Sequence, residues 1–143
     1  SQIAAGVTLP TEGKVFVSLS ARHKDAVGGL GRGLRQLGFD ILATSGTADR
    51  LEAEGIEVIR VKKLAEGKPN LIDYLKNEDV ALILNTPSGK GARTDEGKIR
   101  AAAVQQGVPC ITTVAAAEAA VRAMQAMRED AMQVQSLQER YAE

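Results

Sequence analysis

The sequence predicts an α/β fold with three layers, in which a five-stranded, mostly parallel sheet is covered by helices on both faces. Five short apolar runs of strand length are separated by stretches whose apolar residues recur at helical spacing. The connections between these elements are short, and strands that alternate with helices in this way form parallel sheets. The 143 residues fit a single domain of ordinary size.

The five predicted strands are recognised by different patterns. The run at 56–59 alternates apolar and polar residues. In the last run, 108–111, Pro109 lacks an N–H group, so it lies near the start of the strand or at a sheet edge. The other three are mainly apolar, which is typical of strands buried on both faces, and they span 15–19, 39–43 and 80–84.

Helices are predicted between the strands by helical spacing and by signals at their ends. Gly38, Gly55 and Gly107 each follow a helical pattern and predict its C-terminal end. Asn70 predicts a helix start, and acidic residues behind Thr94 favour the positive end of a helix dipole. The predicted helices span 27–37, 48–54, 71–76, 94–107 and a stretch from about 115 toward 141.

Composition excludes several classes of function. Lys+Arg and Asp+Glu are both 18, and this zero net charge argues against a nucleic-acid-binding protein. Cys110 is the only cysteine, so no internal disulfide can form and a reducing, cytoplasmic location is predicted. No apolar run reaches the ~18 residues that cross a membrane, and we see no signal peptide. The sequence starts at Ser1 without Met, which predicts a piece of a longer protein.

Four segments that follow predicted strands combine hydroxyls, glycine and lysine. They are 18–24, 44–47, 62–63 and 85–90. Sites in parallel sheets lie at the carboxyl ends of the strands, and a phosphate monoester is bound by hydroxyls, lysines and a helix N-terminus. A second interpretation stays open, in which Thr47 caps its helix and the lysines are merely solvated.

Two glycine motifs do not predict nucleotide binding by a known loop. The glycines at 28–33 lie inside a helix and lack the dinucleotide spacing, so we expect them to allow close packing of that helix on the sheet. Residues 88–91 resemble the end of a P-loop. However, Leu84 replaces its first glycine and Gly91 its Ser/Thr.

The remaining reactive side chains give little support for catalysis. His23 is the sole histidine and is interpreted as a surface residue. Cys110 lies in an apolar strand, which favours a buried structural thiol. No Cys/His grouping indicates a metal site.

Segments 43–48 and 85–89 resemble the methylglyoxal-synthase-like fold family. Within it, the chain is most similar to the C-terminal allosteric domains of carbamoyl phosphate synthetase large subunits. Further segments that fit are Val17, Ser18 and Leu19 with Lys24, and the runs 61–70, 99–102 and 109–113. The similarity runs from about Thr11 to Met127. We therefore expect residues 1–127 to form the regulatory domain and residues 128–143 a polar helical extension or a loosely held tail.

The resemblance implies a regulatory domain that binds UMP or IMP and has no catalytic residues, metal or cofactor of its own. The phosphate would lie among Lys24, Thr44, Thr47 and Lys63, and Asn85 with the residues after it would face the ribose and base. Thr112 matches a position that contacts ornithine in relatives regulated by that amino acid. The complete set of implied effector-binding residues is Ser18, Lys24, Thr44, Ser45, Gly46, Thr47, Lys63, Asn85 and Thr112.

The same resemblance implies the partners of the domain. They would be the remaining domains of the large subunit and a glutaminase small subunit. The whole enzyme would be a glutamine-hydrolysing ligase that uses ATP with Mg or Mn in pyrimidine and arginine synthesis. Pro87 stands where some relatives carry a threonine, so the sequence leaves open which nucleotide binds.

The sequence departs from the catalytic members of the family. Methylglyoxal synthases use an aspartate after the third strand and another after the fourth, whereas 65–69 holds no aspartate and Pro87 stands at about the second position. Enediol chemistry then lacks a general base. The Lys-Thr-Leu-His-like stretch of the cyclohydrolase members is also missing. Two alternatives remain: a stand-alone methylglyoxal synthase-type lyase, and a structural or oligomerising domain that binds no effector.

Overall fold

The computed structural model describes residues 13–19, 24–63, 66–67, 69–86 and 93–142. Its five strands form one parallel sheet in the order β3-β2-β1-β4-β5. The predicted five-stranded parallel sheet is therefore confirmed. The strands are β1 (Lys14–Ser18), β2 (Asp40–Ala43), β3 (Ile59–Arg60), β4 (Leu82–Asn85) and β5 (Cys110–Ile111).

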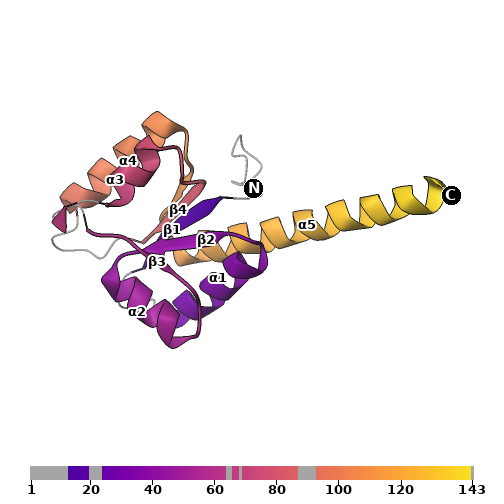
Figure 1. Ribbon diagram of the computed structural model, residues 1–143, viewed down its shortest axis with the longest axis horizontal. Coiled ribbons are helices and arrows are strands. Elements are labelled where there is room, and N and C mark those ends of the chain that lie inside the picture. The colour runs from indigo at the N-terminus through magenta and orange to yellow at the C-terminus, as the bar shows by residue number, and fades with distance from the viewer. Residues whose placement is uncertain (1–12, 20–23, 64–65, 68, 87–92, 143) are drawn as a thin grey trace.

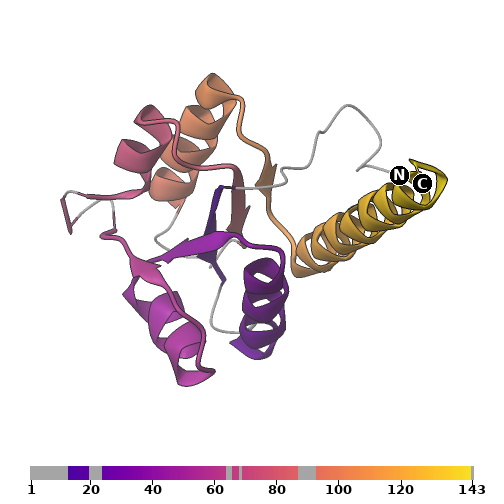
Figure 2. The ribbon, with the colours of Figure 1, turned by 45° about the vertical axis from the view of Figure 1, so that its right-hand side comes forward.

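Helices cover both faces of the sheet, as predicted, and give the molecule three layers (Figures 1 and 2). One face carries α1 (Lys24–Gln36), α2 (Ser45–Ala53) and α5 (Val114–Ala142), and the other carries α3 (Leu71–Lys76) and α4 (Arg93–Gln106). Successive strand residues point to opposite faces. In β1, Val15 and Val17 therefore join the core under α1, α2 and α5, whereas Phe16 joins the core under α3 and α4.

Three strands, β3, β4 and β5, begin two or three residues later than predicted. The chain enters the sheet only at Ile59, which pairs with Leu42, so β3 begins where the predicted strand 56–59 ends. Ile56 is nevertheless buried, because it packs into the core beneath α1 and α2. Val80 is likewise buried outside the sheet, two residues before β4 begins. The apolar pattern therefore predicted correctly that these side chains are buried, but it did not predict which residues pair in the sheet.

The helix ends predicted at Gly38 and Asn70 are confirmed by their hydrogen bonds. After α1, the Gly38 N–H donates to the Arg35 carbonyl and the Phe39 N–H to the Leu34 carbonyl, at 3.0 and 3.1 Å. Gly38 has a φ of 91°, the left-handed conformation that glycine adopts readily at a helix end. At the start of α3, Asn70 forms a capping box, in which its side chain accepts the Ile72 N–H at 2.9 Å.

The glycines of α1 allow close packing against other helices, and the prediction of packing on the sheet was wrong. A Cβ atom on Gly31 would lie 2.6 Å from Leu51 of α2, and one on Gly33 would lie 2.7 Å from Val121 of α5. Real Cβ atoms essentially never show contacts that short. Gly29, in contrast, has open space beside it. Two glycines therefore set how closely α1 approaches its neighbours.

The last helix, α5, begins in the core and then leaves it. Ala117, Ala120, Val121 and Met124 are buried under the sheet face that α1 also covers. Beyond Met127 the helix continues without interruption to Ala142 and projects away from the sheet (Figure 1). The division into residues 1–127 and 128–143 stays a prediction.

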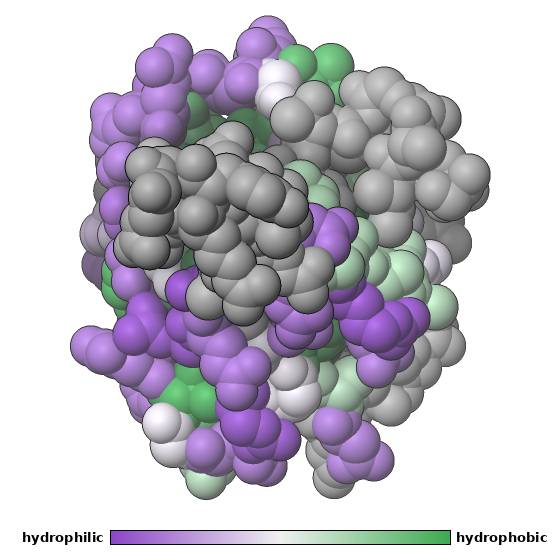
Figure 3. Space-filling model, turned by 90° about the vertical axis from the view of Figure 1, so that its right-hand side faces the viewer, coloured by the Kyte–Doolittle hydropathy of each residue, from purple (hydrophilic) through white to green (hydrophobic). Residues whose placement is uncertain are grey.

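The described surface beside this projection is largely hydrophilic. Figure 3, viewed from that side, shows mostly hydrophilic side chains and only small hydrophobic patches. The longest helix is also too polar to be a membrane span, and within the described residues no other helix is long and apolar enough to cross a bilayer.

Candidate functional site

The sheet order brings three of the predicted polar segments next to one another. β1 lies between β2 and β4, and their carboxyl ends carry Ser18, Thr44 and Asn85. Ser18 pairs directly with Asn85, and the Thr86 N–H donates to the Ser18 carbonyl at 3.0 Å. Ser18, Thr44 and Asn85 are all half-buried. Polar side chains far apart in the sequence thus meet at one edge of the sheet, where α/β sheets place their sites.

The junction of β2 and α2 differs from the interpretation of Thr47 as the residue that caps the helix. α2 begins at Ser45, so its N-cap is Thr44 and Thr47 lies inside the first turn. The interpretation of Thr47 as a capping residue was wrong. Thr44 has an extended backbone, and its side chain makes no capping hydrogen bond. The first N–H groups of a helix have no partner within it, so the hydroxyl of Thr44 leaves them available to another acceptor.

Thr47 is the most deeply buried of the predicted effector residues that the structure describes. Thr47 is 3% exposed to solvent, whereas its neighbours Ser45 and Gly46 are exposed. A buried hydroxyl requires hydrogen-bond partners, and Thr47 Oγ1 accepts from Arg50 Nη2 at 3.4 Å. Thr47 is therefore held in the first turn of α2 at a fixed position.

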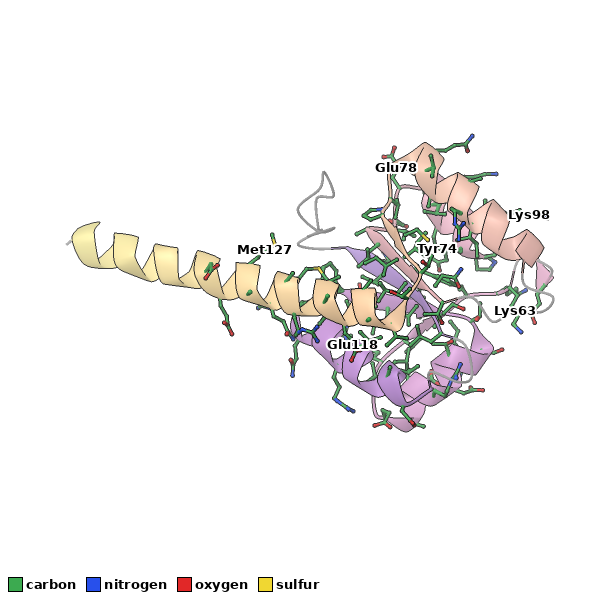
Figure 4. The ribbon with its side chains drawn as sticks, turned by 180° about the vertical axis from the view of Figure 1, so that it is seen from behind. Lys63, Tyr74, Glu78, Lys98, Glu118 and Met127 are labelled. Carbon is green, nitrogen blue, oxygen red and sulfur yellow. The ribbon has the colours of Figure 1, made fainter. Side chains whose placement is uncertain are left out.

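Lys63 belongs to a turn just after β3. The Lys63 N–H donates to the Glu66 carboxylate at 2.8 Å, and the Glu66 N–H donates back to the Lys63 carbonyl at 2.9 Å. A bridge between Lys62 and Asn70 holds the base of this turn. The Lys63 side chain is exposed and lies at the end of the molecule opposite the projecting part of α5 (Figure 4). That end is the carboxyl edge of the sheet.

One implied position, Thr112, is not brought into this group, and the Lys24 side chain is not described. Thr112 follows β5, which β4 separates from β1 and β2, so it lies at the other side of the sheet from Thr44. Its neighbour Thr113 caps α5, accepting the Ala116 N–H at 3.1 Å. Lys24 is the first residue of α1, but its side chain lies outside the described residues. His23 and the loop 87–92 also lie outside them.

Arg50 joins two of these loops, and sequence reasoning missed it. From the second turn of α2, its Nη2 donates to the Leu19 carbonyl, just after β1, at 3.0 Å. Its Nε donates to the Gly46 carbonyl at 3.3 Å. Arg50 follows Thr47 by three residues, and side chains at that spacing share one face of a helix. That spacing was the only signal in the sequence.

Cys110 was predicted to be a buried thiol, and the structure places it half-buried. It lies in β5, packed against the core beneath α3 and α4. Burial raises the pKa of its thiol, and the nearby Arg100 charge offsets part of this rise. A raised pKa lowers the thiolate fraction at neutral pH, and the thiolate is the reactive form. These surroundings make the Cys110 thiol less reactive than a free cysteine.

Known proteins share the sequence and the fold. A model of the family described as "MGS-like domain" matches residues 29–112. The whole chain aligns with the carbamoyl phosphate synthase large chain of Rhodopirellula baltica at 73% identity, and the alignment covers 13% of that relative. A second relative, the "Carbamoyl phosphate synthase large chain, C-terminal section" of Methanopyrus kandleri, is 46% identical. That alignment covers 96% of this chain and 26% of the relative. The chain thus spans a small part of these relatives.

A solved structure of a protein described as methylglyoxal synthase, from Elizabethkingia anophelis, has the same fold. It superimposes with a TM-score of 0.60 over 79% of each chain, at 19% sequence identity. At this identity the similarity extends to the fold alone.

Proposed function

Because this chain belongs to the MGS-like domain family, we propose that it is the regulatory, effector-binding domain of a carbamoyl phosphate synthase large chain. The observation that carries the proposal is the 73% identity over the entire chain with one such large chain. The similarity covers all elements of the fold and not a single motif. In this proposal the domain corresponds to part of the C-terminal section of the large chain, as the relative from Methanopyrus kandleri is named.

The effector in this proposal is a nucleoside monophosphate, UMP or IMP, bound at the carboxyl edge of the sheet. Thr44 and Thr47 would donate to the phosphate together with N–H groups of the first turn of α2, and Lys24 and Lys63 would supply positive charge. Support comes from the adjacency of β2, β1 and β4 and from the uncapped start of α2. Ser18 and Asn85, paired across β1 and β4, would then face the nucleoside.

The proposal extends to the protein of which this domain is a part. That protein would be a cytoplasmic ligase that makes carbamoyl phosphate from glutamine with ATP and Mg or Mn, for pyrimidine and arginine synthesis. Its glutaminase small subunit and the other large-chain domains would be the partners. An ornithine site at Thr112 would lie at the junction with those domains. The separation of Thr112 from the β2–β1–β4 edge supports two distinct sites.

The alternative of a methylglyoxal synthase-type lyase is not proposed. The fold similarity to a methylglyoxal synthase, at 19% identity, carries no argument about activity. The sequence between 65 and 69 lacks the aspartate that such chemistry would use. We expect no release of methylglyoxal from dihydroxyacetone phosphate by this chain. Release that disappears in a Thr47→Val variant would contradict this expectation.

Calorimetric titration of the chain tests the effector proposal. UMP, IMP and inorganic phosphate should bind, and uridine and inosine should bind much more weakly because they lack the phosphate. Phosphate should also raise the melting temperature, since a ligand at a hundredfold its Kd stabilises the folded state by roughly 2.7 kcal/mol. Binding of none of the three phosphate compounds would contradict the proposal and favour a structural domain.

A further inference from the structure

The Arg50 side chain contacts two chain segments at the proposed phosphate site. It contacts the Leu19 carbonyl, at the end of β1, and the Gly46 carbonyl, in the first turn of α2. Helical side chains point toward the N-terminus of their helix, so Arg50 reaches back by one turn. A guanidinium carries several donors in a fixed planar arrangement. One side chain can therefore fix both backbone segments at once.

The stability of α2 does not account for this arrangement. The N-terminal end of a helix is its positive end, and a cation placed there is unfavourable. Arg50 nevertheless directs its charge at the first turn of α2, and that turn contains no acidic residue. The other nearby arginine behaves differently, since Arg60 forms ion pairs with Asp49 and Glu52 on the outer side of the same helix. A local preference broken in this way is expected at functional sites.

We propose that Arg50 is a positioning residue of the phosphate site, which holds Thr47 and the Leu19 carbonyl at the end of β1 in their binding geometry. This inference rests on the effector-binding function proposed above. Arg50 can only donate, so it takes an acceptor site of the Thr47 hydroxyl. The hydroxyl proton is then directed away from Arg50, as required of a donor to a phosphate oxygen. The ligand class is a phosphate monoester dianion, recognised through its oxygens.

The contact with Leu19 extends this role to the second loop. Leu19 is buried, and its carbonyl is bound by Arg50 at 3.0 Å just before the segment that leads to Lys24. Fixing this carbonyl sets where the chain leaves β1. Arg50 thereby connects Leu19, just after β1, with the first turn of α2. Preorganised contacts of this kind lower the ordering cost of binding.

Three variants test the proposal by calorimetry with inorganic phosphate and with UMP. Arg50→Gln should weaken both ligands by the same factor, roughly tenfold, the effect of about one charge-assisted hydrogen bond. Arg50→Lys keeps the charge but has a single donor group on a flexible stem, so it should also bind more weakly than the unmodified chain. Arg60→Gln, which breaks surface ion pairs on the same helix, is the matched control and should bind normally.

A mutant cycle with Thr47 distinguishes positioning from a general structural role. Thr47→Val keeps the shape of the side chain and removes the hydroxyl, so Arg50→Gln should cause a smaller further loss in that background than in the unmodified chain. Full affinity in Arg50→Lys would show that only the charge acts and would overturn the positioning role. Unchanged affinity in Arg50→Gln, or equal losses in both backgrounds, would also overturn it. If the unmodified chain bound neither ligand, the effector proposal itself would fail, which is a different result.

A change of fold is recognised separately. Circular dichroism and amide NMR spectra of each variant without ligand report whether the sheet and α2 are retained. If Arg50→Gln is unfolded, Arg50→Lys alone decides between the charge and the positioning role through its affinity.

Discussion

The helical layer of α1, α2 and α5 and the carboxyl edge of the sheet are held by different interactions. In the layer, apolar side chains pack closely: Gly31 and Gly33 admit Leu51 and Val121 at distances that leave no room for a Cβ atom. At the edge, the contacts are hydrogen bonds from single polar side chains to backbone, such as that from Arg50 to Leu19. Substitutions in the layer should therefore change stability, and substitutions at the edge should change ligand binding.

The largest expected effect tests the edge. Lys63 is exposed and its side chain would contribute one charge-assisted contact to a phosphate, so Lys63→Ala should weaken UMP binding by about ten- to a hundredfold. The melting temperature without ligand should hardly change, because the lysine is then solvated. Calorimetry and thermal unfolding measure the two quantities. Lys76→Ala, at the exposed end of α3, is the control. Unchanged affinity in Lys63→Ala would remove the turn after β3 from the site.

The layer is tested by a pair of substitutions in α1. Gly33→Ala would place a Cβ atom 2.7 Å from Val121 Cγ1. Overpacking of this kind costs about 1–3 kcal/mol of stability, and the higher helix propensity of alanine offsets part of this cost. Gly29→Ala meets open space, so it should stabilise the helix by up to about 1 kcal/mol. Urea unfolding measures both. UMP affinity should be the same in both variants, and a loss confined to Gly33→Ala would mean that the two regions are coupled.

A third substitution lies at the start of α3, on the sheet face opposite the layer of α1, α2 and α5. Asn70 caps α3, and its Nδ2 also donates to the Gly67 carbonyl, in the turn that follows Lys63, at 2.8 Å. Asn70→Ala removes the cap, which costs about 1 kcal/mol of stability, and it also frees that turn. We expect a lower urea midpoint together with a small loss of UMP affinity. Asn77→Ala, at the other end of α3, should leave affinity unchanged. Normal affinity in Asn70→Ala would separate the turn from the site.

The comparison also explains what the sequence could predict. Apolar spacing indicated the buried faces of β1, β2 and β4, and end signals such as Gly38 and Asn70 placed the helix boundaries within a few residues. Residues that follow successive strands were expected at one edge, and the sheet order places Ser18, Thr44 and Asn85 on adjacent strands.

The features that the sequence did not predict depend on contacts between distant parts of the chain. The contact from Arg50 to Leu19 spans 31 positions in the chain, and no local pattern encodes it. The start of α2 was placed too late because the polar run 44–47 contains several residues that favour helix starts, and only backbone geometry shows that the N-cap is Thr44. The packing partners of Gly31 and Gly33 were misassigned for the same reason, since helical spacing does not say which neighbour lies against a face.

The smallest expected effect concerns the far end of the layer, where α5 leaves the core. Arg128 Nη1 donates to the Gln36 carbonyl at 2.6 Å, at the C-terminal end of α1. That carbonyl has no partner within α1 and lies at the negative end of its dipole, so a cation there is favourable. The contact is exposed, and Arg128→Ala should cost only about 0.5–1 kcal/mol, less at high salt because exposed charges are screened. Hydrogen exchange should accelerate around Gln36 and in α5 near Arg128, and should not change at β1. Arg122→Ala, on an exposed position of the same helix, is the control. Equal acceleration in both variants would mean that helix propensity, and not the contact with α1, holds α5 where it leaves the body of the molecule.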